Sequence, residues 1–296
     1  MRDDFTSDWT HRLKWLYLLG VVAMLLSPVF YVIAISFNEH GFGARIYEFT
    51  FDWYRVVAGD TILLQSLEWT AYLALVTVAI AVPMGVLAAK FYHRSRRKVP
   101  FLMLMLTPLF VPADIMGSAL LVYFKNLAQI CEWLGDELGL TFLYGWFELG
   151  FMTAVIGLVI YTLPYVFIVI LITMSRYREQ QTEAARNCGA TAWQAFWHVE
   201  FPQIRPGVLS ACAFTTILTF NETVRTALLK GGFDTFSNVL VSQMLNIGMS
   251  GESYAMAGMM SMVSMIVIGG VLIYSLAAAE RRERQARARA EPRMSA

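Results

Sequence analysis

The sequence contains little charge and few residues of the kinds that hold metals or form disulfides. Of its 296 residues, 15% are charged and 57% are hydrophobic, with a mean hydropathy of +0.53. Soluble domains carry charge on about a quarter of their residues, so this composition excludes an ordinary soluble protein. Three scattered cysteines imply no disulfide framework, and four histidines show no metal-ligand spacing. The net charge of +1 gives no indication of a nucleic-acid partner.

Long apolar runs recur at the length that a membrane-spanning helix requires, which is about 20 residues. They predict an all-α, polytopic membrane protein with six transmembrane helices. The first run is too long for a signal peptide and is expected to remain in the protein. The fifth run is the weakest, because its apolar stretch ends at Phe220. We place the spans at 15–37, 64–91, 100–124, 150–174, 206–228 and 255–279.

Lysine and arginine are distributed unequally between alternate connecting segments. Segments 1–14, 93–98, 175–205 and 280–296 carry 3, 4, 4 and 6 basic residues, whereas 38–62, 125–149 and 229–253 carry 2, 1 and 1. The positive-inside rule therefore predicts that both termini, the 175–205 loop and the basic tail 280–296 are cytoplasmic. The outer segments hold ten acidic residues. These either reflect the same rule or form a weakly negative mouth that attracts a cation.

The predicted cytoplasmic loop 175–205 contains the most informative pattern. Glu183-Ala184-Ala185 is followed by Gly189 and then by Val199-Glu200-Phe201-Pro202. We expect a short helix up to Gly189, which can take the positive φ of a tight turn. A second helix is expected to end before Pro202 and to bury its aromatic residues, Trp193, Phe196 and Trp197, against the ends of the spans. Such an elbow suits a mechanical contact, and an interfacial amphipathic helix is the alternative.

This spacing resembles the cytoplasmic loop of the permease subunits of bacterial ABC importers, in which EAA, three residues, Gly, nine residues and I-x-L-P follow one another. Val199 and Phe201 stand for the Ile and the Leu. In that family the loop contacts a separate ATPase. The resemblance implies one permease domain over 1–296, with the ABC-importer permease fold. It also implies a set of ATPase-coupling residues, namely Glu183, Ala184, Ala185, Gly189 and Pro202.

Segments 49–54, 107–115 and 219–222 resemble the second permease subunit of spermidine/putrescine ABC importers, although segment 125–149 is longer than is usual there. The resemblance implies a polyamine or a related small cation as substrate. Opines, phosphonates, thiamine, metal ions or oxyanions, and sugars remain open as other solutes. An ion-gradient-driven secondary transporter is a further alternative, which inverted repeats or broken helices in matching halves would favour.

The chain is predicted not to be an enzyme. It contains no G-x-x-x-x-G-K-[ST] loop, which is needed to hold nucleotide phosphates. We therefore expect this chain to bind no cofactor, and ATP and Mg²⁺ to bind a partner ATPase. An intramembrane enzyme would need a Ser/His, paired Asp or zinc constellation, and no histidine lies within a predicted span.

Polar residues within the predicted spans indicate a translocation path, because an ionisable group inside a bilayer costs about 2.5–3.5 kcal/mol. Asp114 is expected in the middle of the third span, and Thr215, Thr219, Glu222 and Thr226 are expected to form one stripe on the fifth. Polar contacts between helices are the alternative. If Glu222 instead pairs with Arg225, Asp114 becomes the better ammonium contact. The predicted path comprises Asp114, Ser118, Thr215, Thr219, Asn221, Glu222 and Arg225.

The resemblance also implies an assembly. We expect a sister permease in a heterodimer, two ATPase subunits and a periplasmic solute-binding protein. The complex would lie in the bacterial cell inner membrane as a multi-pass importer, in contact with the lipid bilayer and with no nucleic acid.

Overall fold

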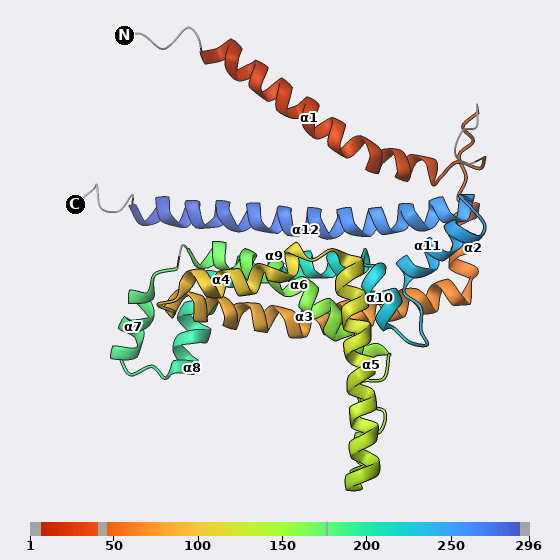
Figure 1. The fold of residues 1–296 in the computed structure, drawn as a ribbon. Helices are drawn as coiled ribbons and strands as arrows, with labels where there is room; N and C mark the ends of the chain where they lie inside the picture. Colours follow the sequence, from red (N-terminus) through yellow and green to blue (C-terminus); the bar gives the residue numbers. More distant parts are fainter. Residues whose placement is uncertain (1–6, 41–45, 176, 291–296) are drawn as a thin grey trace. The chain divides into compact units, whose positions relative to one another are not determined.

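A computed structural model describes residues 7–40, 46–175 and 177–290, and these form helices joined by short connections (Figure 1). The longer helices are α1 (Ser7–Ile35), α3 (Thr61–Arg94), α5 (Ala113–Leu138), α6 (Phe151–Met174), α9 (Phe201–Phe220) and α12 (Gly251–Ala290). The shorter helices are α2 (Asp52–Gly59), α4 (Lys98–Leu106), α7 (Glu179–Asn187), α8 (Ala192–Ala195), α10 (Val224–Leu229) and α11 (Phe236–Asn246). Two 3₁₀ turns, η1 (Thr107–Phe110) and η2 (Thr141–Leu143), and a π-helical turn, η3 (Phe196–Glu200), complete the set. The all-α prediction is confirmed.

Several helices are long and apolar enough to cross a membrane. Within the described residues, four pass on length and composition: Arg12–Ile35, Thr61–Arg94, Phe151–Met174 and Gly251–Val271. A bent pair, Lys98–Phe110 with Ala113–Leu138, adds a fifth crossing if it is counted as one span. The chain is therefore a multi-pass helical membrane protein. The count of six spans and the orientation of the termini stay predictions.

The predicted span over 100–124 is not one continuous helix. The chain bends by 99° between the helical segment that ends at Phe110 and α5. Val111, at the bend, is extended with φ −92° and ψ 122°, and Pro112 precedes the first residue of α5. Proline disfavours the helical conformation in the residue before it, which accounts for the break. Asp114 consequently lies in the first turn of α5, next to the bend.

The predicted span over 206–228 is likewise not one helix, because α9 ends at Phe220 and α10 begins at Val224. Polar side chains in between offer the backbone local partners. The Asn221 Nδ2 donates to the Ile217 carbonyl at 2.8 Å, and Glu222 Oε1 accepts from the backbone N–H of Arg225 at 3.0 Å. Such side-chain bonds compete with a continuous helix. The predicted polar stripe therefore extends over two helices.

The chain divides into two compact units, of which the larger comprises Ile62–Val241 and Ser264–Ala296. Its core lies where α3, α6 and α9 pack together. Glycines allow the close approach: a Cβ on Gly207 of α9 would lie 2.1 Å from Thr173 Oγ1 of α6, and one on Gly85 of α3 would lie 2.4 Å from Val166 Cγ1. The most deeply buried apolar side chains include Leu73, Leu158, Phe167, Ile170 and Ile204.

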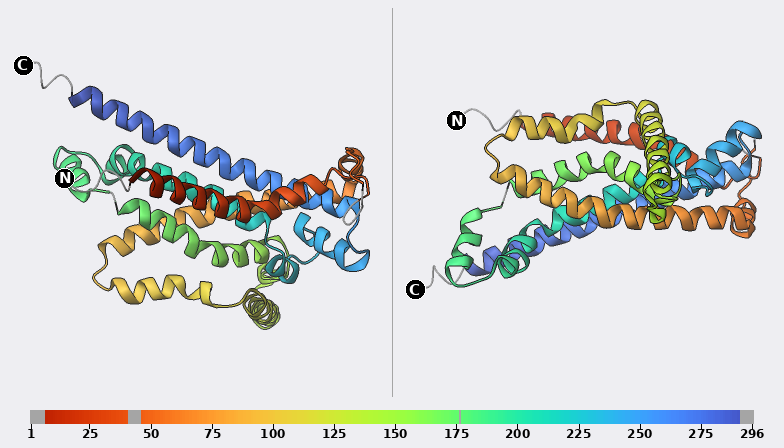
Figure 2. Two further views of the ribbon diagram at one scale, coloured as in Figure 1. Left: turned by 90° about the horizontal axis from the view of Figure 1, so that it is seen from above. Right: turned by 60° about the horizontal axis from the view of Figure 1, so that its bottom comes forward.

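Within this unit, α3, α4, α6 and α9 run along a common direction, and α5 crosses them (Figures 1 and 2). The left view of Figure 2 shows α5 nearly end-on. The short helices α7 and α8 lie at one end of the four helices, whereas α10 and the start of α5 lie at the other end. The loop motif and the polar residues of the predicted path are therefore at opposite ends of the same bundle.

The smaller unit, Met1–Thr61 with Ser242–Val263, is held by aromatic contacts in its described part. The Phe37 ring stacks on Phe49 and on Tyr54, with centroids 5.5 and 4.8 Å apart. The Tyr54 hydroxyl lies 2.6 Å from Ser36 Oγ, and an isolated antiparallel bridge joins Asn38 to Phe49. In the other unit, α12 continues as a helix through Ala290, into the predicted basic tail; residues 291–296 of that tail lie outside the described residues.

Candidate functional site

The loop motif folds as the predicted elbow. Helix α7 ends in a Schellman motif, in which the Ala190 N–H bonds to the Ala185 carbonyl at 3.1 Å and the Gly189 N–H bonds to the Arg186 carbonyl at 3.0 Å. Gly189 has φ +93°, and a Cβ added there would meet nothing within 4 Å. Glycine is therefore required by the backbone conformation and not by crowding. Of the predicted coupling residues, Ala185 is half-buried, and the others, Glu183, Ala184, Gly189 and Pro202, are exposed.

The second arm of the elbow starts at α8, where Thr191 and Gln194 form a capping box. The Gln194 N–H bonds to Thr191 Oγ1 at 3.2 Å, and the Thr191 N–H bonds to Gln194 Oε1 at 2.9 Å. Beyond α8 the prediction that the helix ends before Pro202 is wrong, because the chain continues through η3 into α9. Pro202 is the second residue of α9, directly after the π-helical turn η3, where the hydrogen-bond register of the helix changes.

The hydrogen bonds of the π-helical turn η3 connect α8 to α9 without a break in the helix. The Phe201 N–H bonds to the carbonyl of Phe196, five residues earlier. Trp193 and Trp197 stay 70% and 42% exposed, so the prediction that they bury against the spans is wrong. Both rings instead line an apolar groove with Pro83 of α3. The outcome is one helical rod, α8–η3–α9, that joins the elbow directly to the bundle.

An ion pair between α3 and the η3 part of this rod was not predicted from the sequence. The Lys90 Nζ of α3 donates to Glu200 Oε2 of η3, and Glu200 is 6% exposed. The Tyr177 hydroxyl donates to Glu200 Oε1 at 3.3 Å and contacts Thr182 Oγ1 of α7 at 2.5 Å. Burial raises the pKa of the Tyr177 phenol, so it stays a neutral donor. We name Lys90, Tyr177, Thr182 and Glu200 the loop anchor. Lys90 is the one basic residue within the predicted span 64–91, and this was the sequence feature that could have indicated a buried partner.

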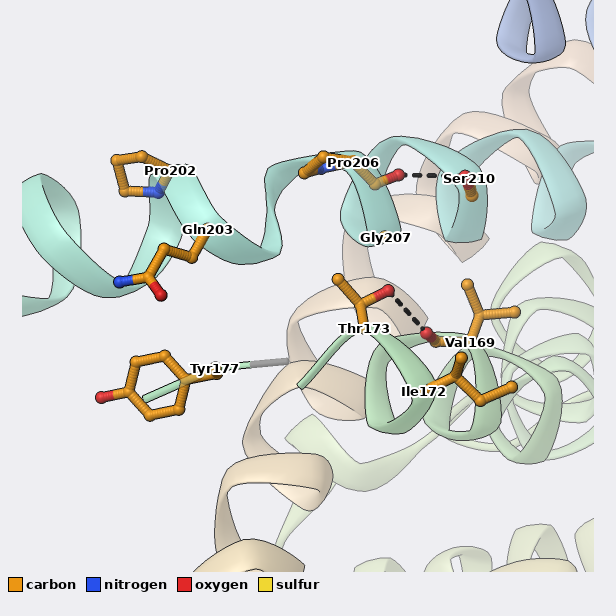
Figure 3. Close-up of a pocket in the computed structure, with 9 residues that line it drawn as sticks. All are labelled: Val169, Ile172, Thr173, Tyr177, Pro202, Gln203, Pro206, Gly207 and Ser210. Atoms are coloured by element: carbon orange, nitrogen blue, oxygen red, sulfur yellow. Dashed lines mark hydrogen bonds between the residues drawn. The ribbon is translucent and has the colours of Figure 1, made fainter. Parts of the chain in front are cut away.

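Beside the loop anchor lies a cavity of about 500 Å³ between the end of α6 and the start of α9 (Figure 3). Two of its hydroxyls already bond within their own helices: Thr173 Oγ1 donates to the Val169 carbonyl at 3.0 Å, and Ser210 Oγ donates to the Pro206 carbonyl at 2.9 Å. The remaining walls are mostly apolar, so we assign no solute to this cavity. It is lined by Val169, Ile172, Thr173, Tyr177, Pro202, Gln203, Pro206, Gly207 and Ser210.

At the other end of the bundle, Glu222 and Arg225 form a buried ion pair, which was the sequence-based alternative to a free Glu222. The Arg225 Nη1 donates to Glu222 Oε2 at 2.8 Å, and the two side chains are 6% and 8% exposed. The Arg225 guanidinium also lies 4.1 Å from the centre of the Tyr161 ring. Thr226 and Ser237 hydroxyls donate to the Glu222 carbonyl at 2.8 and 2.9 Å. The charge of Glu222 is thus neutralised within the fold.

The other predicted path residues divide into buried and exposed groups. Thr215 and Thr219 are buried on α9, and their Oγ1 atoms have no hydrogen-bond partner in the part of the chain that the structure describes. Asp114 and Ser118 are exposed one turn apart on α5, where they border a shallow depression, and Asn221 is exposed at the break. Asp114 lies at a helix N-terminus, where the backbone dipoles favour a carboxylate. The structure therefore does not bring all seven residues into one site.

The fold is that of a helical membrane protein, and comparison with known proteins defines its class. Residues 81–282 match the family of the binding-protein-dependent transport system inner membrane component. The chain belongs to this family and is a permease subunit of an ABC importer.

Two curated relatives from Escherichia coli (strain K12) match most of the chain. The spermidine/putrescine transport system permease protein PotC is 24% identical over 254 residues, which cover 85% of this chain and 89% of the relative. The putrescine transport system permease protein PotI is 24% identical over 267 residues, or 89% and 90% of the two chains. A chain from a solved bacterial ABC transporter involved in the import of the acidic polysaccharide alginate superposes with a TM-score of 0.66. It covers 94% of this chain and 97% of its own length at 15% identity, which shows a shared fold alone.

Proposed function

We propose that this permease moves a small cation, most specifically a polyamine, and is driven by ATP hydrolysis on a separate subunit. The observation that carries the proposal is the elbow of α7 and α8, which is exposed and continuous with α9. In the proposed complex a sister permease completes a heterodimer, and two ATPase subunits bind ATP and Mg²⁺. A periplasmic solute-binding protein delivers the solute, and the complex lies in the bacterial cell inner membrane.

The coupling role rests on how the elbow presents its residues. Glu183 and Ala184 are exposed on α7, so a partner surface can approach the small alanine and meet a charge beside it. The Schellman motif at Gly189 fixes the direction of α7 relative to the rod α8–η3–α9. A displacement of α7 would therefore reach α9 through the backbone itself. We assign Glu183, Ala184, Ala185, Gly189 and Pro202 to the ATPase contact on this basis.

The substrate assignment rests on Asp114 and on the names of the relatives. Glu222 is neutralised by Arg225 and is therefore a poor ligand for an ammonium group. Asp114 is exposed at a break in the helix, and no ion pair of its carboxylate is found among the described residues. Both curated relatives are named as polyamine permeases. The remaining members of the proposed path, Ser118, Thr215, Thr219 and Asn221, would supply hydroxyl and amide contacts.

Uptake by the reconstituted complex tests the substrate. The complex would be purified through a tag on this chain, placed in proteoliposomes with its binding protein, and given labelled putrescine or spermidine. Asp114→Asn should raise the concentration for half-maximal uptake about tenfold, since a hydrogen bond to a charged group contributes about 1.5 kcal/mol or more. Glu137→Gln is the matched control, because Glu137 is an exposed acid at the other end of α5.

Two results would contradict separate parts of the proposal. Parental uptake by an intact Asp114→Asn complex would remove Asp114 from the path. A complex that hydrolyses ATP but takes up neither polyamine would refute the substrate, while the coupling proposal would stand.

A further inference from the structure

Glu200 is a buried carboxylate whose partners come from distant segments. Lys90 lies on α3, 110 residues away in sequence, and Tyr177 lies between α6 and α7. The Lys90 ammonium is also 4.6 Å from the centre of the Phe196 ring. One lysine therefore contacts both ends of the π-helical turn η3. A buried carboxylate needs such partners, because an unpaired one is strongly destabilising.

The loop anchor also provides the buried attachment of α7 to the bundle. Thr182 is the buried residue of α7, at 5% exposure, and its hydroxyl meets that of Tyr177. Two further polar contacts of α7 are exposed. Arg94 Nε of α3 lies 3.6 Å from Glu179 Oε1, and Gln203 Nε2 donates to Gln181 Oε1 at 3.0 Å. Water can replace exposed contacts such as these at little cost, whereas Thr182 and Glu200 of the loop anchor are buried.

We infer that Lys90, Tyr177 and Glu200 are positioning residues that fasten the elbow to α3, so that α7 and α3 move as one body during ATP-driven transport. The inference rests on the proposed coupling role of the loop. Without the anchor, a displacement of α7 would pass to α9 through the backbone alone. With the anchor it also reaches α3, whose Gly85 packs against α6 in the core. The anchor thus distributes one movement over the helices of the bundle.

The test uses a double variant in which both charges are replaced together. Lys90→Met with Glu200→Gln keeps the volume and removes the ion pair without leaving a buried charge alone, which protects the fold. Arg94→Gln with Glu179→Gln is the matched control, because it removes the exposed ion pair that joins α3 to α7. Both variants would be made in the full chain and studied in the assembled, reconstituted complex.

Two measurements separate positioning from simple loss of structure. The first is putrescine uptake per ATP hydrolysed, which we expect to fall about fivefold or more in the double variant, the lower end of coupling effects between sites. The second needs no transported solute: spin labels at Arg186 of α7 and Leu87 of α3, both exposed, report the distance between the two helices. We expect this distance to stay constant through the ATP cycle in the parent and to change in the double variant. The control should match the parent.

A double variant with the parental uptake ratio and an unchanged label distance would overturn the inference. Glu183→Lys shows whether the coupling proposal itself holds. If Glu183→Lys uncouples the complex while the double variant behaves as the parent, the loop anchor is not a transmission element and the coupling loop still is. If neither change affects the complex, the coupling proposal fails with it.

Discussion

Arg225 binds Glu222 through both its backbone and its side chain. Its N–H donates to Oε1 at 3.0 Å, and its Nη1 donates to Oε2 at 2.8 Å. The carboxylate therefore caps the first turn of α10 and neutralises a buried guanidinium at the same time. Glu222 therefore stabilises the fold at the break between α9 and α10. Replacing it should first lower the stability of the protein.

Arg225→Ala should destabilise the protein by about 3–5 kcal/mol, because it leaves the Glu222 carboxylate buried and unpaired. Glu222→Gln should cost less, since an amide oxygen can still accept the Arg225 N–H. The thermal midpoint of the detergent-purified chain measures both effects. The double change Glu222→Gln with Arg225→Met is the control and should melt near the parent. Equal midpoints for Arg225→Ala and the parent would contradict this account.

Gly207→Ala should destabilise the packing of α6 on α9 by about 1–3 kcal/mol, the usual cost of overfilling a core. The added Cβ would lie 2.1 Å from Thr173 Oγ1 and 2.6 Å from Thr173 Cβ, so the two helices must move apart. Gly270→Ala is the matched control on α12, where nothing lies within 4 Å of the added atom. Its midpoint should be unchanged or slightly higher, because alanine favours a helix. A stable Gly207→Ala variant would show that the helices tolerate the wider spacing.

Gly189→Val should lower the stimulation of the partner ATPase while the chain still inserts and folds. A φ of +93° is strained for any residue with a Cβ, at about 1–2 kcal/mol, and most of all for a β-branched one. Because a side chain there meets no neighbour, the effect should come from the changed direction of α7. Gly189→Asn is the matched variant and should retain more activity, since asparagine tolerates left-handed backbone. Equal ATPase rates for all three chains would exclude a role for the elbow angle.

The isolated chain should not bind ATP, because its sequence contains no glycine-rich phosphate loop with a lysine. Equilibrium dialysis with labelled ATP and Mg²⁺ measures this directly. The complex with its ATPase should bind nucleotide under the same conditions. Stoichiometric binding by the chain alone would contradict the proposed division of labour.

The elbow could be predicted from the sequence because its determinants are local. Gly189 and the capping pair of Thr191 and Gln194 lie within six residues, and the backbone follows from them. The ion pair of Lys90 with Glu200 could not be predicted in this way, since the two residues meet only after α3 and η3 have packed. The pairing of Glu222 with Arg225 could be predicted in part. Their spacing of three residues indicated a possible ion pair, but only the folded structure shows that both side chains are buried.

The bend before α5 shows why a local signal can be ambiguous. Pro112 breaks the helix, yet Pro28, Pro83 and Pro164 lie inside α1, α3 and α6. In a membrane, neighbouring helices can satisfy the carbonyl that a proline leaves free, so proline alone does not identify a break. The extended conformation of Val111 decides the outcome at this position.

The segment that precedes this bend is too short to reach across a bilayer. Residues Lys98–Phe110 rise about 20 Å, against a hydrocarbon thickness of about 30 Å. We therefore expect the chain to turn aside inside the hydrocarbon layer, where unpaired backbone groups are tolerated only against protein or water. The first turn of α5 then forms an internal ledge, with its free N–H groups and Asp114 together at one level. A solute on the proposed path would then meet the Asp114 carboxylate at the depth where its own hydration is hardest to keep.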